Sequence, residues 1–231
     1  MSLLVESRLV GDVTVVACRG RIVEGAESAP LQRKLDDVIA SPDPYIVLDL
    51  GGVEFIDSAG LGLLVRYLTR SRSARGHLTL CAVPPKISDV LRMTRLKAVF
   101  EAHDSEAEAI AASYRPTPVA GAPYRFSTDI LCVEQSVDVQ CYVRELLAQA
   151  GYGVLTAGNL PDGLILMQAA RPKVLVIGAD LRTARNTATA QRFNSLADAH
   201  RVVELPAAFS RDDAGDAGER LLAEVRAVLG G

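Results

Sequence analysis

The sequence predicts an α/β protein made of two domains. Three observations lead to this prediction: β-branched runs alternate with segments of helical hydrophobic spacing, the chain has 231 residues, and a proline-rich stretch divides the alternating series. Residues 115–123 contain three prolines and one glycine. We therefore expect residues 115–125 to form a semi-stiff linker between a first domain, 1–114, and a second domain, 126–231.

The first domain is expected to combine strands and helices in an α/β arrangement. Runs rich in Val, Leu and Ile predict strands at 3–10, 13–18, 45–50, 78–83 and 99–102. Apolar residues at helical spacing predict helices at 26–40, 58–70, 86–95 and 105–112. Residues 45–50 are almost continuously apolar, which predicts a strand buried on both faces and closed by Gly51 and Gly52.

The second domain repeats the alternation, with a parallel sheet as the expected centre. Strands are predicted at 130–133, 154–157, 173–177 and 201–205. Helices are predicted at 137–150, 160–170 and 214–229, and the polar, Ala-rich stretch 182–200 is expected to be helical in part.

Composition and charge narrow the range of functions. The formal net charge is −3, so no basic field favours a nucleic acid or an anionic membrane as partner. No apolar run approaches the roughly 20 residues that a membrane-spanning helix needs, and no signal-peptide pattern begins the chain. Cys18, Cys81 and Cys132 lie inside apolar runs, and no C-x-x-C pair occurs. These features predict a reduced, cytoplasmic protein.

The segment Phe55–Gly62 is the most informative local feature. A strand gives way to Asp57 and Ser58, an apolar helix follows, and either residue could be its N-cap. Gly60 and Gly62 weaken the first turns by roughly 1 kcal/mol each relative to Ala, which suggests close backbone approach to something such as a partner surface. A phosphate on a serine at this point would meet the positive end of the helix dipole. Local pattern alone favours a simple capping role.

The residues around this segment resemble those of the STAS family, whose members include anti-sigma-factor antagonists. Residues 48–62 are similar to the family's central motif, Asp-Ser-x-Gly-Leu-Gly between a strand and a helix. Residues 20–22, 76–80 and 90–96 resemble further family motifs in the same order, so the resemblance spans nearly the whole first domain. It implies the STAS fold, a mixed sheet with helices. The chain departs from the family pattern at Arg95, where glycine is usual.

The resemblance implies a bacterial regulator switched by phosphorylation at Ser58. The implied partner is an anti-sigma factor that is also a serine/threonine kinase of the histidine-kinase-like ATPase family. It binds the unphosphorylated antagonist and releases the phosphorylated one, and a PPM-type serine phosphatase resets the switch. Asp57 is expected to help present the serine. The partner-binding residues expected on this basis are Arg21, Asp57, Ser58, Ala59, Gly60, Leu61 and Gly62.

The second domain resembles a response-regulator receiver that has lost its phosphorylation chemistry. Glu134 could supply half of the acidic pair that such receivers need, but Gln135 replaces the other half. Gly178 falls where the phosphorylated Asp should lie, Ala207 takes the place of the Lys, and the unit is short by about one helix and one strand. Because Mg²⁺ is held through several oxygen ligands, we expect no Mg²⁺-dependent aspartyl phosphorylation here. A flavodoxin-like fold kept for packing or protein contact is the favoured interpretation.

No catalytic set, cofactor motif or metal-ligand spacing is visible in the sequence. The three histidines, His77, His103 and His200, are scattered along the chain, and none is close to Ser58 in sequence. A regulatory binding protein is therefore favoured over an enzyme. The main alternative makes the first domain a small-ligand or nucleotide sensor, or a scaffold, without phospho-switching. Whether the chain forms a homodimer is left open.

Overall fold

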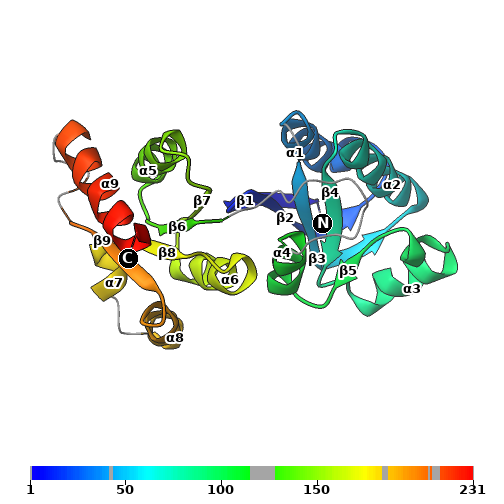
Figure 1. Cartoon of the computed structure of the whole chain (residues 1–231). Coiled ribbons are helices and arrows are strands. Elements are labelled where there is room, and N and C mark those ends of the chain that lie inside the picture. The colour runs from blue at the N-terminus through cyan, green and yellow to red at the C-terminus, as the bar shows by residue number, and fades with distance from the viewer. Residues whose placement is uncertain are drawn as a thin grey trace. The chain divides into compact units, whose positions relative to one another are not determined.

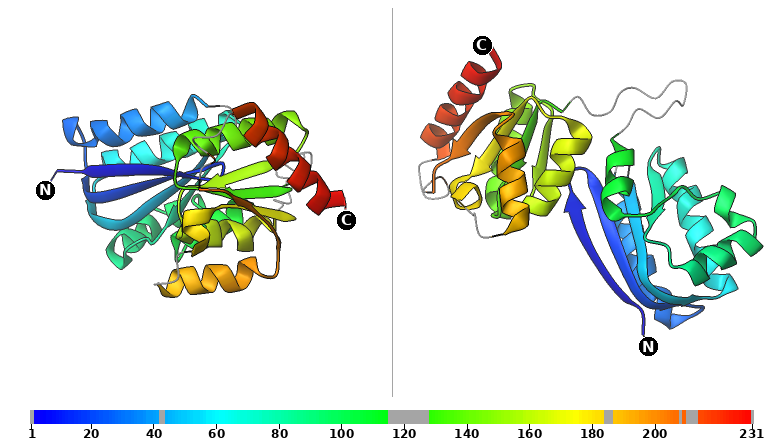
Figure 2. Two further views of the ribbon diagram at one scale, coloured as in Figure 1. Left: turned by 90° about the vertical axis from the view of Figure 1, so that its left-hand side faces the viewer. Right: turned by 90° about the horizontal axis from the view of Figure 1, so that it is seen from below.

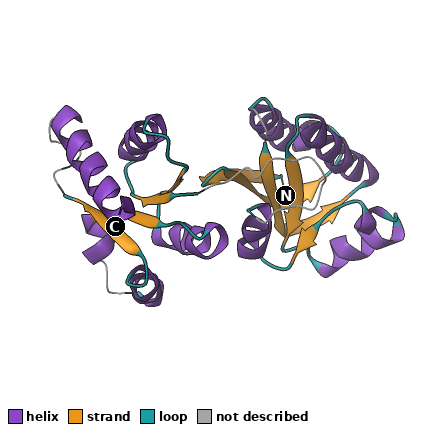
Figure 3. Ribbon diagram, in the orientation of Figure 1, coloured by secondary structure: helices purple, strands orange, loops and turns teal. Residues whose placement is uncertain are grey.

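The computed structural model describes residues 2–41, 44–114, 128–183, 187–207, 209 and 214–230. Contacts divide the chain into two compact units, Met1–Ser113 and Tyr114–Gly231. In each unit the strands form a central sheet with helices on its outside (Figure 1; Figure 3). The linker predicted at 115–125 lies outside the described residues.

The first unit contains a five-stranded sheet in the order β1-β2-β3-β4-β5. Its strands are β1 (Leu4–Val10), β2 (Val13–Ile22), β3 (Tyr45–Ile56), β4 (His77–Cys81) and β5 (Ala102–His103). β1 and β2 form an antiparallel hairpin, and all other neighbouring strands are parallel. The predicted mixed sheet is thus confirmed.

Helices cover both faces of this sheet (Figure 2). They are α1 (Ala29–Ile39) after a 3-10 turn η1 (Ala26–Ser28), α2 (Ser58–Ser73), α3 (Pro85–Met93) before a 3-10 turn η2 (Leu96–Ala98), and α4 (Glu106–Ser113). α1, α2 and α3 share one hydrophobic core with the sheet, to which α2 contributes Leu61, Leu64, Tyr67 and Leu68. α4 packs against β3 and β4 on the opposite face (Figure 1).

β3 is longer than the sequence indicated. The prediction that Gly51 and Gly52 end this strand is wrong, because pairing with β2 continues to Ile56. The pairing shifts register near Arg19, and a Cβ at Gly52 would lie 2.5 Å from the Arg19 side chain. These glycines therefore let the strands pass closely through an irregular stretch rather than ending them. The extension carries Phe55 to the start of α2.

The short final strand predicted at 99–102 is present, but it lies further along the chain. Residues 96–98 form η2, Phe100 enters the core, and β5 consists only of Ala102 and His103. Arg95, directly before η2, adopts the left-handed conformation with φ 61° and ψ 14°. The backbone there has the shape that a glycine would take most readily, although arginine occupies the position. The family departure at Arg95 thus leaves the turn intact.

The second unit contains a parallel four-stranded sheet in the order β7-β6-β8-β9. Its strands are β6 (Ile130–Val133), β7 (Val154–Ala157), β8 (Val174–Gly178) and β9 (Arg201–Leu205). This order equals that of the first four strands in doubly wound sheets of the 2-1-3-4-5 type. The predicted parallel α/β arrangement is confirmed, whereas the likeness to receivers in particular stays a prediction.

Helices cover both faces of the second sheet as well. They are α5 (Val137–Gln149), α6 (Leu160–Ala170), α7 (Ala179–Thr183), α8 (Ala188–Ala197) and α9 (Ala214–Gly230). α5 and α9 contact one another on one face, and α6 and α8 on the other (Figure 1). The predicted helical content of 182–200 is confirmed by α7 and α8, with residues 184–186 outside the description.

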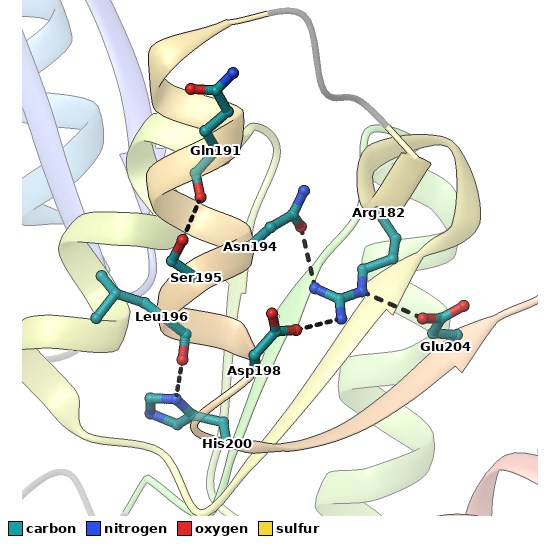
Figure 4. Close-up of polar contacts among 8 residues, drawn as sticks. All are labelled: Arg182, Gln191, Asn194, Ser195, Leu196, Asp198, His200 and Glu204. Atoms are coloured by element: carbon teal, nitrogen blue, oxygen red, sulfur yellow. Dashed lines mark hydrogen bonds and ion pairs between the residues drawn. The ribbon is translucent and has the colours of Figure 1, made fainter.

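Arg182 of α7 joins three polar side chains at the outer strand β9 (Figure 4). Its Nη2 donates to Asp198 Oδ1 at 2.7 Å, its Nη1 to Asn194 Oδ1 at 3.1 Å, and its Nε to Glu204 Oε1 at 3.3 Å. One planar guanidinium thus ties α7, the end of α8 and β9 together. Because its donors are paired in this way, we assign Arg182 a structural role.

The described cysteines are unpaired. Cys18, Cys81 and Cys132 are buried, and burial raises the pKa of each thiol to about 12. They are therefore protonated and unreactive at neutral pH, as expected of small core residues.

Candidate functional site

Asp57 caps helix α2. It has extended backbone angles, and its Oδ1 accepts a hydrogen bond from the Gly60 amide at 2.7 Å. Its Oδ2 accepts from the Glu24 amide at 3.0 Å, which ties the loop after β2 to the start of the helix. The sequence left open whether Asp57 or Ser58 is the cap, and the structure assigns the role to Asp57.

The environment of Asp57 favours its ionised form. The Gly60 amide, and after it the Glu24 amide, lowers the pKa of the Asp57 carboxyl by hydrogen bonding, and the positive charge of Arg21 acts in the same direction. A negative charge is therefore fixed in position beside Ser58 at neutral pH.

Ser58 is the first residue of α2 and is exposed. Within the described part of the chain, its hydroxyl has no hydrogen-bond partner, because the neighbouring carboxylate already serves as the cap. The hydroxyl is accessible and is not needed by the fold, which is what modification by a second protein requires.

The other residues expected at the partner surface fall into two groups. Gly60 and Leu61 are buried in their own domain, and a Cβ at Gly60 would lie 2.4 Å from the Ile22 carbonyl oxygen. Gly60 is thus required by close contact between α2 and β2. Ala59 and Gly62 are exposed, and a Cβ at Gly62 would meet nothing within 4 Å. Intramolecular packing therefore explains Gly60 but not Gly62.

Arg21 and Phe55 form an exposed pair next to this helix start. The two residues are opposite one another in the β2–β3 register, and the Arg21 guanidinium carbon lies 4.8 Å from the centre of the Phe55 ring. Phe55 remains 45% exposed, which is unusual for a large aromatic side chain. Sequence reasoning included Arg21 but missed Phe55, because the strand that positions it was expected to end earlier.

A groove with a volume of about 240 Å³ opens beside Ala59 and Gly62. It lies between the loop after β2, helix α1 and helix α2, and it is lined by Val23, Glu24, Gly25, Ser28, Gln32, Ala59, Gly62, Leu63 and Arg66. Arg66 Nη2 donates to Gln32 Oε1 at 3.4 Å across the two helices. The groove combines both signs of charge with exposed backbone, a surface suited to protein contact.

In the second unit, Glu134 and Gly178 meet at the carboxyl ends of the adjacent strands β6 and β8. The Glu134 carboxylate fills the space beside Gly178, where a Cβ would lie 2.0 Å from Glu134 Oε2. Glu134 Oε1 also accepts a hydrogen bond from the Ser136 amide at 2.9 Å, and Gln135 is exposed. Glu134 is thus engaged locally, and the absence of aspartyl phosphorylation stays a prediction.

The described residues include no helix that is both long and apolar enough to cross a membrane. They also include no group of three or more His, Cys, Asp or Glu side chains arranged to hold a metal ion.

Comparisons with known proteins concern the first unit. Residues 5–109 match the family described as STAS domain. An anti-sigma factor antagonist named BtrV from Bordetella bronchiseptica is 29% identical over 104 residues, which make up 45% of this chain and 89% of that protein. The anti-sigma F factor antagonist of Paenibacillus polymyxa is 26% identical over 111 residues, 48% of this chain and 94% of that protein. A crystal structure of an anti-sigma factor antagonist from Mycobacterium paratuberculosis has 25% identity, covers 49% of this chain and 96% of its own, and has a TM-score of 0.44.

Proposed function

We propose that this chain is an anti-sigma-factor antagonist in a partner-switching pathway. The proposal starts from the STAS domain at residues 5–109. Its first unit binds an anti-sigma factor that is also a serine kinase of the histidine-kinase-like ATPase family. The kinase phosphorylates Ser58 and the complex then dissociates, and a PPM-type serine phosphatase restores the binding form. The names of the relatives from Bordetella and Paenibacillus support the antagonist role.

The state of the Ser58 hydroxyl carries this proposal. It is exposed at the first position of α2, and the cap that it could have supplied comes from Asp57. A kinase can therefore take this hydroxyl as its acceptor without disturbing the start of the helix. The STAS domain needs no base of its own, because a kinase supplies the residue that orients the attacking hydroxyl.

Charge explains why phosphorylation would release the partner. A phosphoserine carries about −1.5 to −2 charges at neutral pH. Here they would be added beside the fixed negative charge of Asp57 and next to the exposed residues Ala59 and Gly62. A partner fitted to the neutral hydroxyl would have to desolvate this charge, which opposes binding.

We assign the second unit a role in protein contact rather than in phosphotransfer. Gly178 stands at the end of β8 and offers no acceptor group, and the Glu134 carboxylate lies in the space beside it. A receiver-like fold of this kind could hold the chain in a signalling assembly.

The experiment measures affinity for the serine kinase/anti-sigma factor encoded in the same genome, by titration calorimetry with the full chain. The native chain and Ser58→Ala are expected to bind, and Ser58→Asp is expected to lose at least roughly tenfold in affinity, which corresponds to about 1.4 kcal/mol. Ser73→Asp, an exposed serine at the other end of α2, is the charge control and should bind like the native chain. Undiminished binding by Ser58→Asp would contradict the switch.

The groove of about 240 Å³ beside Gly62 favours one alternative, a domain that senses a small ligand such as a nucleotide. That function predicts an increase in the melting temperature of the full chain with ATP or GTP, equal in the native chain and in Ser58→Ala. An absence of any increase would remove this alternative.

A further inference from the structure

The Arg21–Phe55 pair has no role in the core, yet it lies at the modification site. Both residues are at the carboxyl ends of neighbouring parallel strands, and the next pair in the register is Ile22 with Ile56. The Asp57 amide donates to the Ile22 carbonyl at 3.2 Å, so the chain turns into α2 directly after this point. Arg21 is thereby held at the same end of the sheet as Ser58.

Arg21 forms no ion pair in the described part of the chain. Its described contact is the face of the Phe55 ring, and no carboxylate there forms an ion pair with it. An exposed cation–π contact is weak, and a doubly charged phosphate can exceed it through charge-assisted hydrogen bonds to the guanidinium. The field of Arg21 already reaches the residue before Ser58, where it favours the ionised carboxylate of Asp57.

The backbone donors at the start of α2 are only partly available to a phosphate on Ser58. The Gly60 amide is already bonded to Asp57 Oδ1, so one of the donors of the first turn is occupied. The Asp57 carboxylate is held in place by two backbone amides and cannot move away from an added negative charge. A nearby cation would therefore stabilise the phosphorylated chain.

We propose that Arg21 is the residue that binds the phosphate of phosphorylated Ser58, moving from the Phe55 ring to do so. This inference rests on the proposed function, because that function includes the phosphorylation of Ser58. It adds the residue of the domain, Arg21, that responds to the phosphate. When the guanidinium leaves the ring, the exposed Phe55 face changes together with the charge at Ser58. A partner that contacts this end of the sheet would meet both changes.

The test is a ³¹P NMR titration of the full chain carrying phosphoserine at position 58, installed by genetic encoding. The second pKa of a phosphoserine is ordinarily about 6, and a nearby cation lowers it. Arg21→Gln is expected to raise this pKa by roughly 0.2 to 0.7 pH unit, the range that corresponds to exposed ion pairs. Arg19→Gln is the matched control, because Arg19 is an exposed arginine two residues earlier on β2, opposite Gly52.

Two results would overturn the inference: an unchanged phosphoserine pKa in Arg21→Gln, or an equal increase in Arg19→Gln. Because the phosphoserine is incorporated during translation, the outcome does not depend on any kinase or binding partner. A failure of the proposed function would appear instead in the affinity of the kinase for Ser58→Asp.

Discussion

The Asp57 carboxylate accepts a hydrogen bond from the Gly60 amide at 2.7 Å, and Ser58 between them leaves its hydroxyl unused. Replacement of an Asp cap by Ala typically costs about 1 kcal/mol, so Asp57→Ala should lower the stability of the first unit by that amount. Ser58→Ala should change it by less than about 0.5 kcal/mol. Hydrogen exchange of the β3 core amides in the full chain measures both changes. Equal losses in the two variants would show that Ser58 shares the capping role.

The contribution of Asp57 should depend on pH. Its pKa is lowered in the folded chain, chiefly by the Gly60 amide, whereas the pKa of an unfolded Asp is about 3.9. A carboxyl with a depressed folded pKa contributes stability above its unfolded pKa and loses it as the pH falls through the folded pKa. The stability difference between the native chain and Asp57→Ala should thus be constant from about pH 5 to 8 and shrink below about pH 4. Denaturant titrations at several pH values test this, and a difference that grows on acidification would contradict it.

Gly60 and Gly62 provide a matched pair of substitutions in one helix. Gly60→Ala should be destabilising, because its Cβ would lie 2.4 Å from the Ile22 carbonyl oxygen. Gly62→Ala meets open space and should stabilise the helix by up to about 1 kcal/mol. Hydrogen exchange in β3 again gives the sign of each change. If Gly62→Ala also weakens binding of the kinase partner, Gly62 belongs to the interface, and unchanged binding would exclude it.

Thr79 should be a site of easy stabilisation. The residue is 1% exposed, and its hydroxyl lacks a hydrogen-bond partner within the described residues. Thr79→Val removes this buried group at nearly constant volume and should gain about 1 kcal/mol in unfolding free energy. Ser71→Ala is the opposite case, because the buried Ser71 hydroxyl donates to the Leu68 carbonyl at 3.0 Å, and it should destabilise. A loss of stability in Thr79→Val would contradict the assignment.

Glu134 and Gly178 should be coupled energetically. A Cβ at Gly178 would lie 2.0 Å from Glu134 Oε2, the end of a flexible side chain, so Gly178→Ala should shift the carboxylate, disturb its bond from the Ser136 amide and destabilise the unit modestly. In a Glu134→Ala background the same substitution should cost much less, with a coupling of roughly 0.5–3 kcal/mol. Exchange of the β6 amides in the four variants gives this coupling. If the effects of Gly178→Ala and Glu134→Ala on stability are strictly additive, the contact between the two residues does not contribute to stability.

The sequence predicted the two α/β units, most elements within a few residues, and the position of Ser58 at the start of a helix. These features follow from local hydrophobic periodicity and from the family motif, which the match at residues 5–109 confirms for the first unit. Tertiary pairing explains the error in the length of β3. The local sequence Gly51-Gly52 indicates the end of a strand, but β3 continues past these glycines to Ile56 because it pairs with β2.

The same limit applies to the candidate site. Which of two adjacent residues caps α2 depends on side-chain geometry, and the Glu24 amide that helps to hold Asp57 lies 33 residues away in the chain. Phe55 could have been found only by extending the strand and noting that its register partner is Arg21. The contact between Glu134 and Gly178 likewise arises from the pairing of two strands, which local patterns do not encode.

The central claim is that Ser58 is the phosphoacceptor of this chain, and intact mass spectrometry tests it most directly. The full chain is incubated with ATP, Mg²⁺ and the serine kinase/anti-sigma factor of the same genome, alongside Ser58→Ala and the control Ser73→Ala. We predict that the native chain and Ser73→Ala each gain the mass of one phosphate and that Ser58→Ala gains none. A full phosphate gain in Ser58→Ala would contradict the account.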